Sequence, residues 1–286
     1  MISTLLSDKA MAKRFNILSF AAVLVLLASC AKAGLDGGFA TASFSVGLPQ
    51  TKAVESVSEI NTLYAVIYDS EGNEFQKLTL EGSGGHFDSF SVPVVVNETY
   101  SIALWAQSSS SGLFSVPDGD VRRITATYGN VSVNNYTDAA FTYSGTFSVS
   151  SDKALSLTLK RAVSLVKIMS TTNPGTNLPA MPEFNVSVTF EGGVAAGYDA
   201  LTGETVPAEG ETDFAAGAAT METETSQGTD VYEMAYVYVL PSGANATRIG
   251  AMVLDANYGV AGKFEAFDVP LQPNRRTVLS GDMFGN

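Results

Sequence analysis

One cysteine and one histidine are the only side chains in this 286-residue sequence that could supply thiol or imidazole chemistry. Cys30 has no second cysteine with which to form a disulfide or a thiolate metal site. His86 follows the glycine-rich stretch Gly82–Gly85, which is typical of an exposed turn. It lacks the second histidine or free thiol that a catalytic triad or a zinc site within the chain would need. We therefore predict a protein that is not an enzyme and that carries no cofactor and no bound metal.

Three other groups of residues could do chemistry, and each has a plainer alternative. Asp118 and Asp120 lie on one tight turn and could contribute to a calcium site, but no further ligands follow at the spacing of a calcium loop. Glu222 and Glu224 are more typical of solvated charge than of a glycosidase carboxylate pair. Trp105 could stack on a sugar ring, although a tryptophan in an apolar strand more often packs in a core.

The segment before Cys30 has the layout of a bacterial secretory signal peptide. The stretch Ile17–Leu27 is apolar but too short to span a bilayer, and the basic residues Lys13 and Arg14 precede it. Its last residues, Leu27-Ala28-Ser29-Cys30, resemble a lipobox, the tetrapeptide at which a lipoprotein is cleaved and acylated.

This layout predicts that residues 1–29 are a signal peptide, with Met11 as an alternative start, and that the mature chain begins at Cys30. Cys30 would carry lipid, palmitate included, on its sulfur and its new amino terminus. Residues 30–38 would then form a lipid-anchored tether. The mature protein would then be exported and tethered to a membrane surface, with the membrane as a partner through the lipid.

Composition limits the partners of the mature chain. The formal net charge is −13, with 29 acidic residues against 16 basic ones. A polyanion of this kind repels nucleic acid, so no nucleic-acid partner is expected. The hydrophobic fraction of 45% is too high for a disordered chain, so we expect folded domains.

Alternation of apolar and polar residues dominates the chain after the signal peptide. In Phe39–Leu48 the even positions are apolar and the odd positions mostly polar, which is typical of a strand with one buried face. Leu63–Tyr68 is apolar on both faces, as expected of a central strand. Short strands of these two kinds recur to the end of the sequence and predict antiparallel β-sandwiches.

Two such sandwiches fit the length of the chain, with a boundary near Lys160 and Arg161. We predict an N-terminal β-sandwich over residues 39–160 and a C-terminal β-sandwich over residues 161–286. Residues 205–230 are rich in Ala, Gly, Thr and Glu and contain no basic residue. They are predicted to form a long acidic surface loop with one weak strand near Asp213 and Phe214.

Several segments, taken together and in order, resemble the fimbrillin family, the pilus subunits of Bacteroidales, and in particular its small two-domain lipoprotein members. The resemblance runs from about residue 39 to the end, and the segments that carry it are Ala42–Ala53, Leu63–Asp69, Tyr100–Gln107, Leu159–Val166, Tyr198–Glu204 and Val269–Thr277.

The resemblance implies an all-β protein of two tandem transthyretin-like sandwiches that is exported as a lipoprotein to the outer membrane, at the cell surface. It also implies that a trypsin-like protease removes the first strand, after which a strand from another pilus subunit, identical or related, fills the open groove. An exposed sheet edge is a template for such an added strand. Lys52 stands at the processing position, where the family more often has arginine, and the chain's own Arg276–Ser280 is a candidate donor strand.

The resemblance therefore favours a surface structural protein, a pilus or adhesin subunit that assembles by strand exchange. The alternative is a monomeric outer-membrane lipoprotein that uses the same sandwiches to bind a glycan or a host protein.

Overall fold

The computed structural model describes an almost entirely β-stranded protein, which confirms the predicted all-β class. The residues described are 38–49, 57–172, 184–226, 229–257 and 259–285. Their helical elements are three short 3-10 helices: η1 (Val57–Glu59), η2 (Pro117–Gly119) and η3 (Tyr136–Asp138). Within these ranges no helix has both the length and the apolar character needed to cross a membrane.

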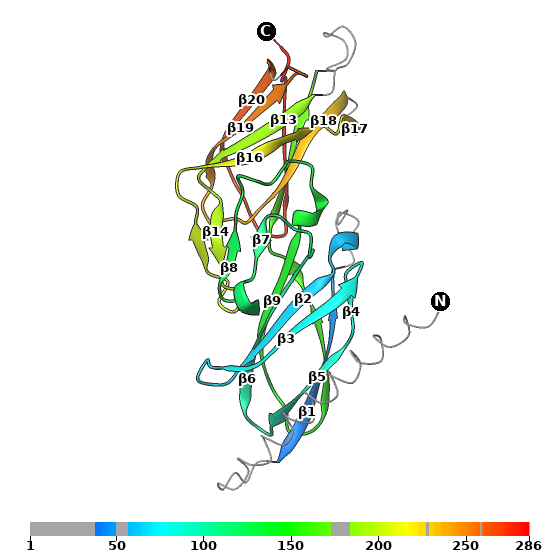
Figure 1. Cartoon of the computed structure of the whole chain (residues 1–286), viewed down its shortest axis with the longest axis vertical. Helices are drawn as coiled ribbons and strands as arrows, with labels where there is room; N and C mark the ends of the chain where they lie inside the picture. The colour runs from blue at the N-terminus through cyan, green and yellow to red at the C-terminus, as the bar shows by residue number, and fades with distance from the viewer. Residues whose placement is uncertain (1–37, 50–56, 173–183, 227–228, 258, 286) are drawn as a thin grey trace, which may run out of the picture.

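The N-terminal half contains two sheets, drawn mainly in blue, cyan and green in Figure 1. The first, called the β1 sheet here, has the order β10-β1-β5 and consists of β10 (Lys153–Thr158), β1 (Phe39–Gly47) and β5 (Phe90–Val95). The second is six-stranded, in the order β11 (Lys160–Arg161), β9 (Ala140–Ser148), β6 (Thr99–Gln107), β2 (Thr62–Tyr68), β3 (Glu74–Ser83) and β4 (His86–Phe87). As the presence of Pro93 predicts, β5 lies at a sheet edge.

The C-terminal half contains two four-stranded sheets. The β12 sheet has the order β17 (Glu222–Ser226), β18 (Thr229–Val239), β12 (Ser164–Ser170) and β21 (Arg276–Gly281). The β13 sheet has the order β16 (Glu211–Ala218), β13 (Asn185–Glu191), β19 (Ala246–Leu254) and β20 (Val260–Val269).

Local sequence explains why the β2–β3 hairpin forms. β2 is buried at nearly every position, which suits its place between β3 and β6. The turn after it is organised by Asp69, whose Oδ1 accepts hydrogen bonds from the backbone N–H groups of Glu71 and Asn73, each at 2.9 Å. These bonds, first among them the one from Asn73, hold the pKa of the Asp69 carboxyl below its usual value.

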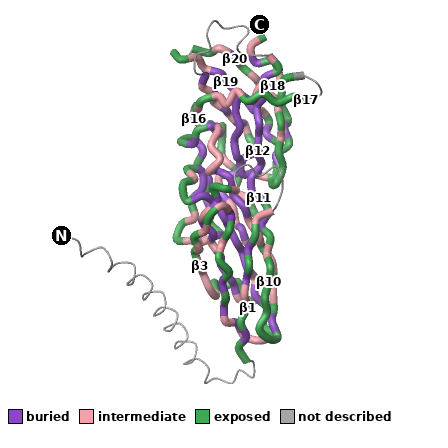
Figure 2. Tube along the Cα trace, turned by 90° about the vertical axis from the view of Figure 1, so that its right-hand side faces the viewer, coloured by how far each residue is buried: buried purple, intermediate pink, exposed green. Residues whose placement is uncertain are grey.

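The buried residues form one continuous apolar interior along the molecule, seen in purple in Figure 2. Trp105, predicted to pack in a core rather than to stack on a sugar, is fully buried. Its ring contacts those of Phe114 and Tyr198, and its Nε1–H donates to Gln107 Oε1 at 2.7 Å. A buried indole that has found a hydrogen-bond acceptor is a stable core group.

Two strand pairs are parallel, where simple hairpin connections would make every pair antiparallel. β1 runs parallel to β10, and β12 runs parallel to β21. In the C-terminal half the first strand pairs with the last strand of that half, and in the N-terminal half β1 pairs with β10, the last strand before β11. Because more than a hundred residues separate these partners in the sequence, no tight turn dictates their direction.

The prediction of a long acidic loop over residues 205–230 was wrong, although the weak strand expected near Asp213 and Phe214 is confirmed and lies in β16. This region contains β15 (Thr205–Pro207), β16 and β17. The side chains of Thr212 and Phe214 are buried, and β16 pairs with β13 along most of its length. The strand signal is weak in the sequence because small residues, Ala215–Ala218, occupy the second half of β16.

A fifth sheet joins the two halves. It has the order β15-β14-β8-β7, with β14 at Ala195–Tyr198, β8 at Ile124–Ala126 and β7 at Phe114–Ser115. β7 and β8 lie in the long connection from β6 to β9, so a segment of the N-terminal half pairs with strands of the C-terminal half. We call this sheet the junction sheet; β7, β8 and β14 occupy the middle of the molecule in Figure 1.

Side chains in the connection from β6 to β9 also bind this connection to the C-terminal half. The buried Tyr128 hydroxyl donates to the carbonyl of Ala195 at 2.8 Å and accepts from the N–H of Leu240 at 3.2 Å. Asn134 Oδ1 accepts from the N–H of Tyr236 at 2.7 Å. The Tyr136 ring stacks on that of Tyr236, with centroids 4.5 Å apart.

We predict that Tyr128→Phe lowers the free energy of unfolding by about 1–3 kcal/mol, because it leaves two buried backbone groups without a partner. Denaturant unfolding followed by circular dichroism measures this loss. Tyr64→Phe, on the half-buried side of β2, is the matched control and should change stability by less than about 0.5 kcal/mol. Equal stability of the two variants would contradict a stabilising role of the Tyr128 hydroxyl at the junction.

Candidate functional site

The strand β1 is the most distinctive element for function because of where it lies. It is the middle strand of the β1 sheet, hydrogen-bonded along one edge to β10 and along the other to β5. The chain between β1 and β5 forms β2, β3 and β4, which belong to the opposite sheet. A strand from the very start of the fold therefore fills the space between two strands that come later.

The inner face of β1 is apolar, as the alternation in the sequence predicted. Ala40, Ala42, Phe44 and Val46 are buried, and Leu48, just beyond the strand, is half-buried. The Phe44 ring stacks on Phe90 of β5 and meets the edge of a third aromatic ring from β9, that of Phe147. Burial of a side chain such as Phe44 stabilises the fold by roughly 1.5–3 kcal/mol.

The outer face of β1 is polar and accessible. Ser43 Oγ lies 2.8 Å from Ser91 Oγ on β5, and Ser45 Oγ donates to Ser156 Oγ on β10 at 3.1 Å. These serine hydroxyls add little to the binding of β1 beyond its backbone hydrogen bonds to β10 and β5. The strand is therefore held by its two backbone edges and by one apolar face, which are features that another strand of similar alternation can supply.

Departure of β1 would leave a groove the width of one strand. Because neighbouring strands lie about 4.8 Å apart, β10 and β5 are about 9.6 Å apart across β1. Both would then present unpaired backbone N–H and C=O groups beside an uncovered apolar floor, which is unfavourable in water.

Two residues predicted from the sequence to be modified, Cys30 and Lys52, lie outside the described residues. The last residue of β1, Gly47, precedes Lys52 by five positions in the sequence. The candidate donor segment Arg276–Ser280 falls in β21, at the edge of the β12 sheet, where it pairs with β12 of its own chain.

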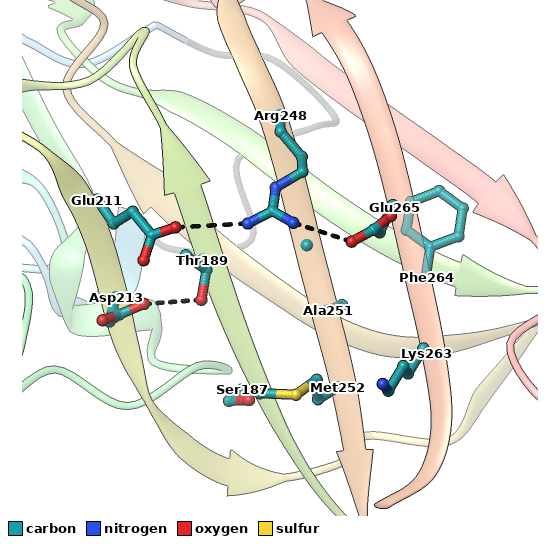
Figure 3. Close-up of a pocket in the computed structure, with 11 residues that line it drawn as sticks. Ser187, Thr189, Glu211, Asp213, Arg248, Ala251, Met252, Lys263, Phe264 and Glu265 are labelled. Carbon is teal, nitrogen blue, oxygen red and sulfur yellow. Dashed lines mark hydrogen bonds and ion pairs between the residues drawn. The ribbon is translucent and has the colours of Figure 1, made fainter.

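A second candidate site is a hollow on the outer face of the β13 sheet, with a volume of about 370 Å³ (Figure 3). Gly250 lies at its floor; a side chain at this position would meet nothing within 4 Å. The Arg248 guanidinium pairs with Glu191, with Glu265 at 3.0 Å and with Glu211 at 3.4 Å.

The polar groups of this hollow largely satisfy one another. Thr189 Oγ1 donates to Asp213 Oδ1 at 2.7 Å, and the positive charge of Arg248 is shared among three carboxylates. Met252 is 41% exposed at the rim, and Phe267 of β20 is 66% exposed beside Arg248. The hollow combines carboxylates with exposed apolar groups, a lining suited to a neutral, hydroxyl-bearing ligand. Sequence reasoning missed it because its residues come from four strands.

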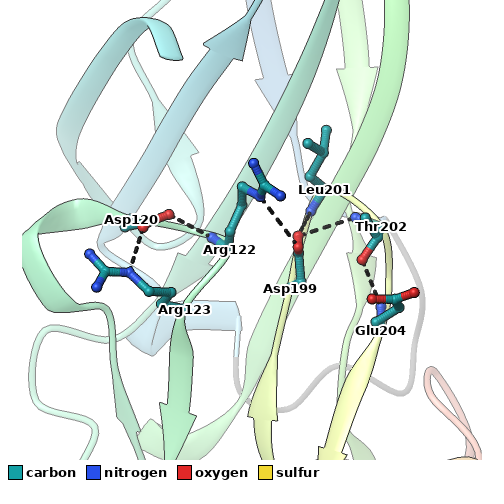
Figure 4. A network of polar contacts seen from close by, with 7 residues as sticks. All are labelled: Asp120, Arg122, Arg123, Asp199, Leu201, Thr202 and Glu204. Carbon is teal, nitrogen blue, oxygen red and sulfur yellow. Dashed lines mark hydrogen bonds and ion pairs between the residues drawn. The ribbon is translucent and has the colours of Figure 1, made fainter. Parts of the chain in front are cut away.

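The turn at Asp118 and Asp120 is a structural turn. Asp118 has a left-handed φ of 53°, and Asp120 Oδ2 accepts from Arg123 Nε at 2.7 Å (Figure 4). Burial opposes ionisation of Asp120, but the hydrogen bonds from Arg123 and Arg122 hold the pKa of its carboxyl below the usual value.

Arg122 also reaches across the junction. Its Nε lies 3.4 Å from Asp199 Oδ2, on the turn that follows β14 (Figure 4). The carboxylate of Asp199 in addition accepts from the N–H groups of Leu201 and Thr202, so it anchors this turn and the junction together.

The remaining candidates occupy ordinary positions. His86 is exposed on β4 beside the Gly84–Gly85 turn. Glu222 and Glu224 are exposed on β17, as predicted, but Glu224 also forms an ion pair at 3.2 Å with Lys167. Across the described ranges, no three His, Cys, Asp or Glu side chains are placed to hold a metal ion together.

Lys167 itself was not singled out from the sequence. It is buried on β12, and its Nζ lies 2.5 Å from the Oε2 of the equally buried Glu233 on β18. Removal of one partner from such a pair is far more costly than its presence is favourable, so the pair is a structural requirement of the β12 sheet.

The architecture has counterparts among solved structures. They include a candidate adhesin from Bacteroides ovatus, with a TM-score of 0.47, 11% identity and coverage of 87% of this chain and 88% of that chain. A candidate adhesin from Bacteroides thetaiotaomicron has a TM-score of 0.49, 9% identity and coverage of 80% and 81%. The fimbrial anchor protein Mfa2 from Porphyromonas gingivalis has a TM-score of 0.45, 11% identity and coverage of 83% and 90%.

No curated protein matches the sequence. A family model does match it, over nearly the whole folded part of the chain. Residues 39–286 fit the model of DUF6562, a family of unknown function, and the chain belongs to that family.

Proposed function

We propose that this chain is an exported surface structural protein, a pilus or adhesin subunit that assembles by strand exchange after its first strand is removed. The observation that supports this proposal best is the position of β1 between β10 and β5. Its partners are other pilus subunits, identical or related.

The construction of β1 suits replacement. The strand contributes an apolar face, two backbone edges and a few short polar side chains, and no ion pair of its side chains with another described residue is present. A donor strand with alternating apolar residues could reproduce the first two contributions. Cleavage after Lys52 would sever β1 from the remainder of the sandwich on the C-terminal side of the strand.

The candidate donor strand within this chain is Arg276–Ser280. It presents half-buried Thr277 and Leu279, with Val278 47% exposed. To act as a donor it would first have to leave β12, with loss of its parallel pairing there. A donor from the tether or another region of a related subunit avoids this cost.

The same proposal includes the organisation and location of the chain. Residues 1–29 act as a signal peptide, Cys30 is acylated and residues 30–38 tether the protein to the outer membrane at the cell surface. Residues 39–160 and 161–286 are the two sandwich domains, and the junction sheet connects them.

The hollow on the β13 sheet supports a second candidate function, a monomeric outer-membrane lipoprotein that binds a glycan or a host protein. Its volume of about 370 Å³ falls within the range of small-molecule sites. This function needs neither cleavage at Lys52 nor release of β1, so the two candidates can be separated by experiment.

We expect limited trypsin treatment of the purified, unacylated protein to cut after Lys52 and to yield higher oligomers, because loss of β1 uncovers an apolar groove. Native size-exclusion chromatography with mass spectrometry measures both events. Lys52→Gln is the control and should stay uncut at this position and monomeric. Cleavage at Lys52 that leaves a stable monomer would instead favour the binding lipoprotein.

We expect Phe44→Ala to lower the free energy of unfolding of the intact protein by about 3–5 kcal/mol, because it empties the aromatic contact with Phe90 and Phe147. The fluorescence of the single tryptophan, Trp105, reports unfolding of this half. Ser45→Ala, on the outer face of the same strand, should cost less than about 0.5 kcal/mol. A small effect of Phe44→Ala would mean that β1 contributes little to the core.

We expect Cys30→Ser to abolish acylation and to move the protein from the membrane fraction to the soluble fraction. The reason is that serine offers no thiol for the lipid. Metabolic labelling with a fatty acid and detergent partitioning measure the change. A Cys30→Ser protein that remains in the membrane fraction with unchanged detergent behaviour would refute the lipoprotein assignment.

A further inference from the structure

A pocket of about 750 Å³ lies beside the place where the chain passes from the N-terminal half to the C-terminal half. Thr142 and Lys160 line it from the six-stranded sheet, and the segments 240–243 and 272–275 line it from the C-terminal half. It is separate from the β1 sheet and from the hollow on the β13 sheet.

The charge of this pocket is opposite to that of the protein. The chain has a net charge of −13, yet three basic residues, Lys160, Arg161 and Arg275, line the pocket and no acidic residue does. Glu204 lies between two lining residues in the sequence but is not itself a lining residue. A concentration of positive charge in a concave site favours a negatively charged ligand.

Two of the three basic side chains are not paired with a carboxylate of another described residue, so their charge is available to a ligand. Lys160 and Arg275 are exposed, and neither forms an ion pair with another described residue. Arg161 differs, because its guanidinium lies over the rings of Phe141 and Tyr238 at 5.9 and 5.8 Å and is buried among them. It contributes positive charge to the wall of the pocket, and it packs against aromatic rings where the two halves meet.

The backbone holds Lys160 and Arg275 in place. Lys160 lies on β11, where it pairs with Thr142 of β9. The carbonyl of Arg275 accepts a hydrogen bond from the N–H of Leu165 at 3.0 Å. The preceding residue, Asn274, has a left-handed φ of 58° and donates its N–H to Val163 at 3.1 Å. Both cations therefore project from backbone that is fixed before a ligand arrives.

The rest of the lining is neutral. Thr205, Ser242 and Gln272 offer hydrogen-bonding groups, and Pro241 and Pro273 offer apolar surface. Polar groups that can bond hydroxyls, beside apolar patches and fixed cations, match a ligand that carries both hydroxyls and an anionic group.

We infer that this pocket binds an acidic sugar, with Lys160 and Arg275 contacting its carboxylate. The inference goes beyond strand exchange and does not depend on it, because no residue of β1 lines the pocket. A protein with such a pocket could contact acidic glycans whether it is assembled or monomeric.

Isothermal titration of the full-length protein with digalacturonic acid tests the inference, with neutral galactobiose and inorganic phosphate as the comparison ligands. We expect digalacturonic acid alone to bind well. Lys160→Gln and Arg275→Gln should each weaken its binding by about tenfold, and added salt should weaken the wild-type complex. Lys77→Gln, which removes a half-buried lysine of β3 that lines neither this pocket nor the hollow on the β13 sheet, should leave the affinity unchanged.

Four results would overturn the inference: no binding of digalacturonic acid, equal binding of the neutral disaccharide, equal binding of phosphate, or equal weakening by Lys77→Gln. Circular dichroism of each variant confirms that it is folded. The strand-exchange proposal has a separate readout, oligomerisation after trypsin treatment, so either proposal can fail while the other stands.

Discussion

The N-terminal sandwich depends on a strand that is bound along both edges by strands formed later in the chain. β1 pairs with β5 on one side and with β10 on the other, and its Phe44 packs between aromatic rings from both sheets. Without β1, the β1 sheet would consist of two separated strands over an open apolar floor. The strand is therefore central to the N-terminal sandwich, and yet its contacts are of a generic kind.

This combination of importance and generic contacts explains why β1 is the proposed site of function. A strand held by ion pairs or by an interlocking side-chain network could be replaced only by a close copy. β1 is held by backbone ladders, by an alternating apolar face and by serine hydroxyls, and strands with similar alternation are common in proteins of this class.

The C-terminal half is built differently. Its β12 sheet contains the buried Lys167–Glu233 pair, and the outer face of its β13 sheet carries the network around Arg248. Loss of one partner of the buried Lys167–Glu233 pair would leave an uncompensated buried charge, which is strongly destabilising. The junction sheet, Tyr128 and the Arg122–Asp199 pair bind this half to the N-terminal half, so exchange at β1 would take place on a firmly supported scaffold.

The hollow on the β13 sheet and the junction pocket also differ in local charge. The protein as a whole is acidic, and the hollow on the β13 sheet contains more carboxylates than cations. The junction pocket is basic although it is formed by the same chain. Local charge can thus differ in sign from net charge, because only the side chains around a concave site determine the field inside it.

The sequence by itself determined the all-β class, most of the strands and the inner face of β1. Alternation of apolar and polar residues is a local signal, so Phe44 and Val46 could be assigned to a buried face, and Pro93 to an edge strand, without tertiary information. The single histidine and the single cysteine also predict a protein without catalytic chemistry, and this stays a prediction.

Tertiary structure alone decided which strands distant from one another in the sequence are neighbours. The parallel partners of β1 and β12 lie more than a hundred residues away, and no turn connects them. β16 was predicted only as a weak strand near Asp213 and Phe214, because its Ala and Gly residues carry little alternation signal. β17, whose residues are all polar, was not predicted; the two strands pair with β13 and β18. The carboxylates that pair with Arg248 come from separate strands, and the cations of the junction pocket come from separate strands and loops. The sequence alone does not show that these residues lie close together.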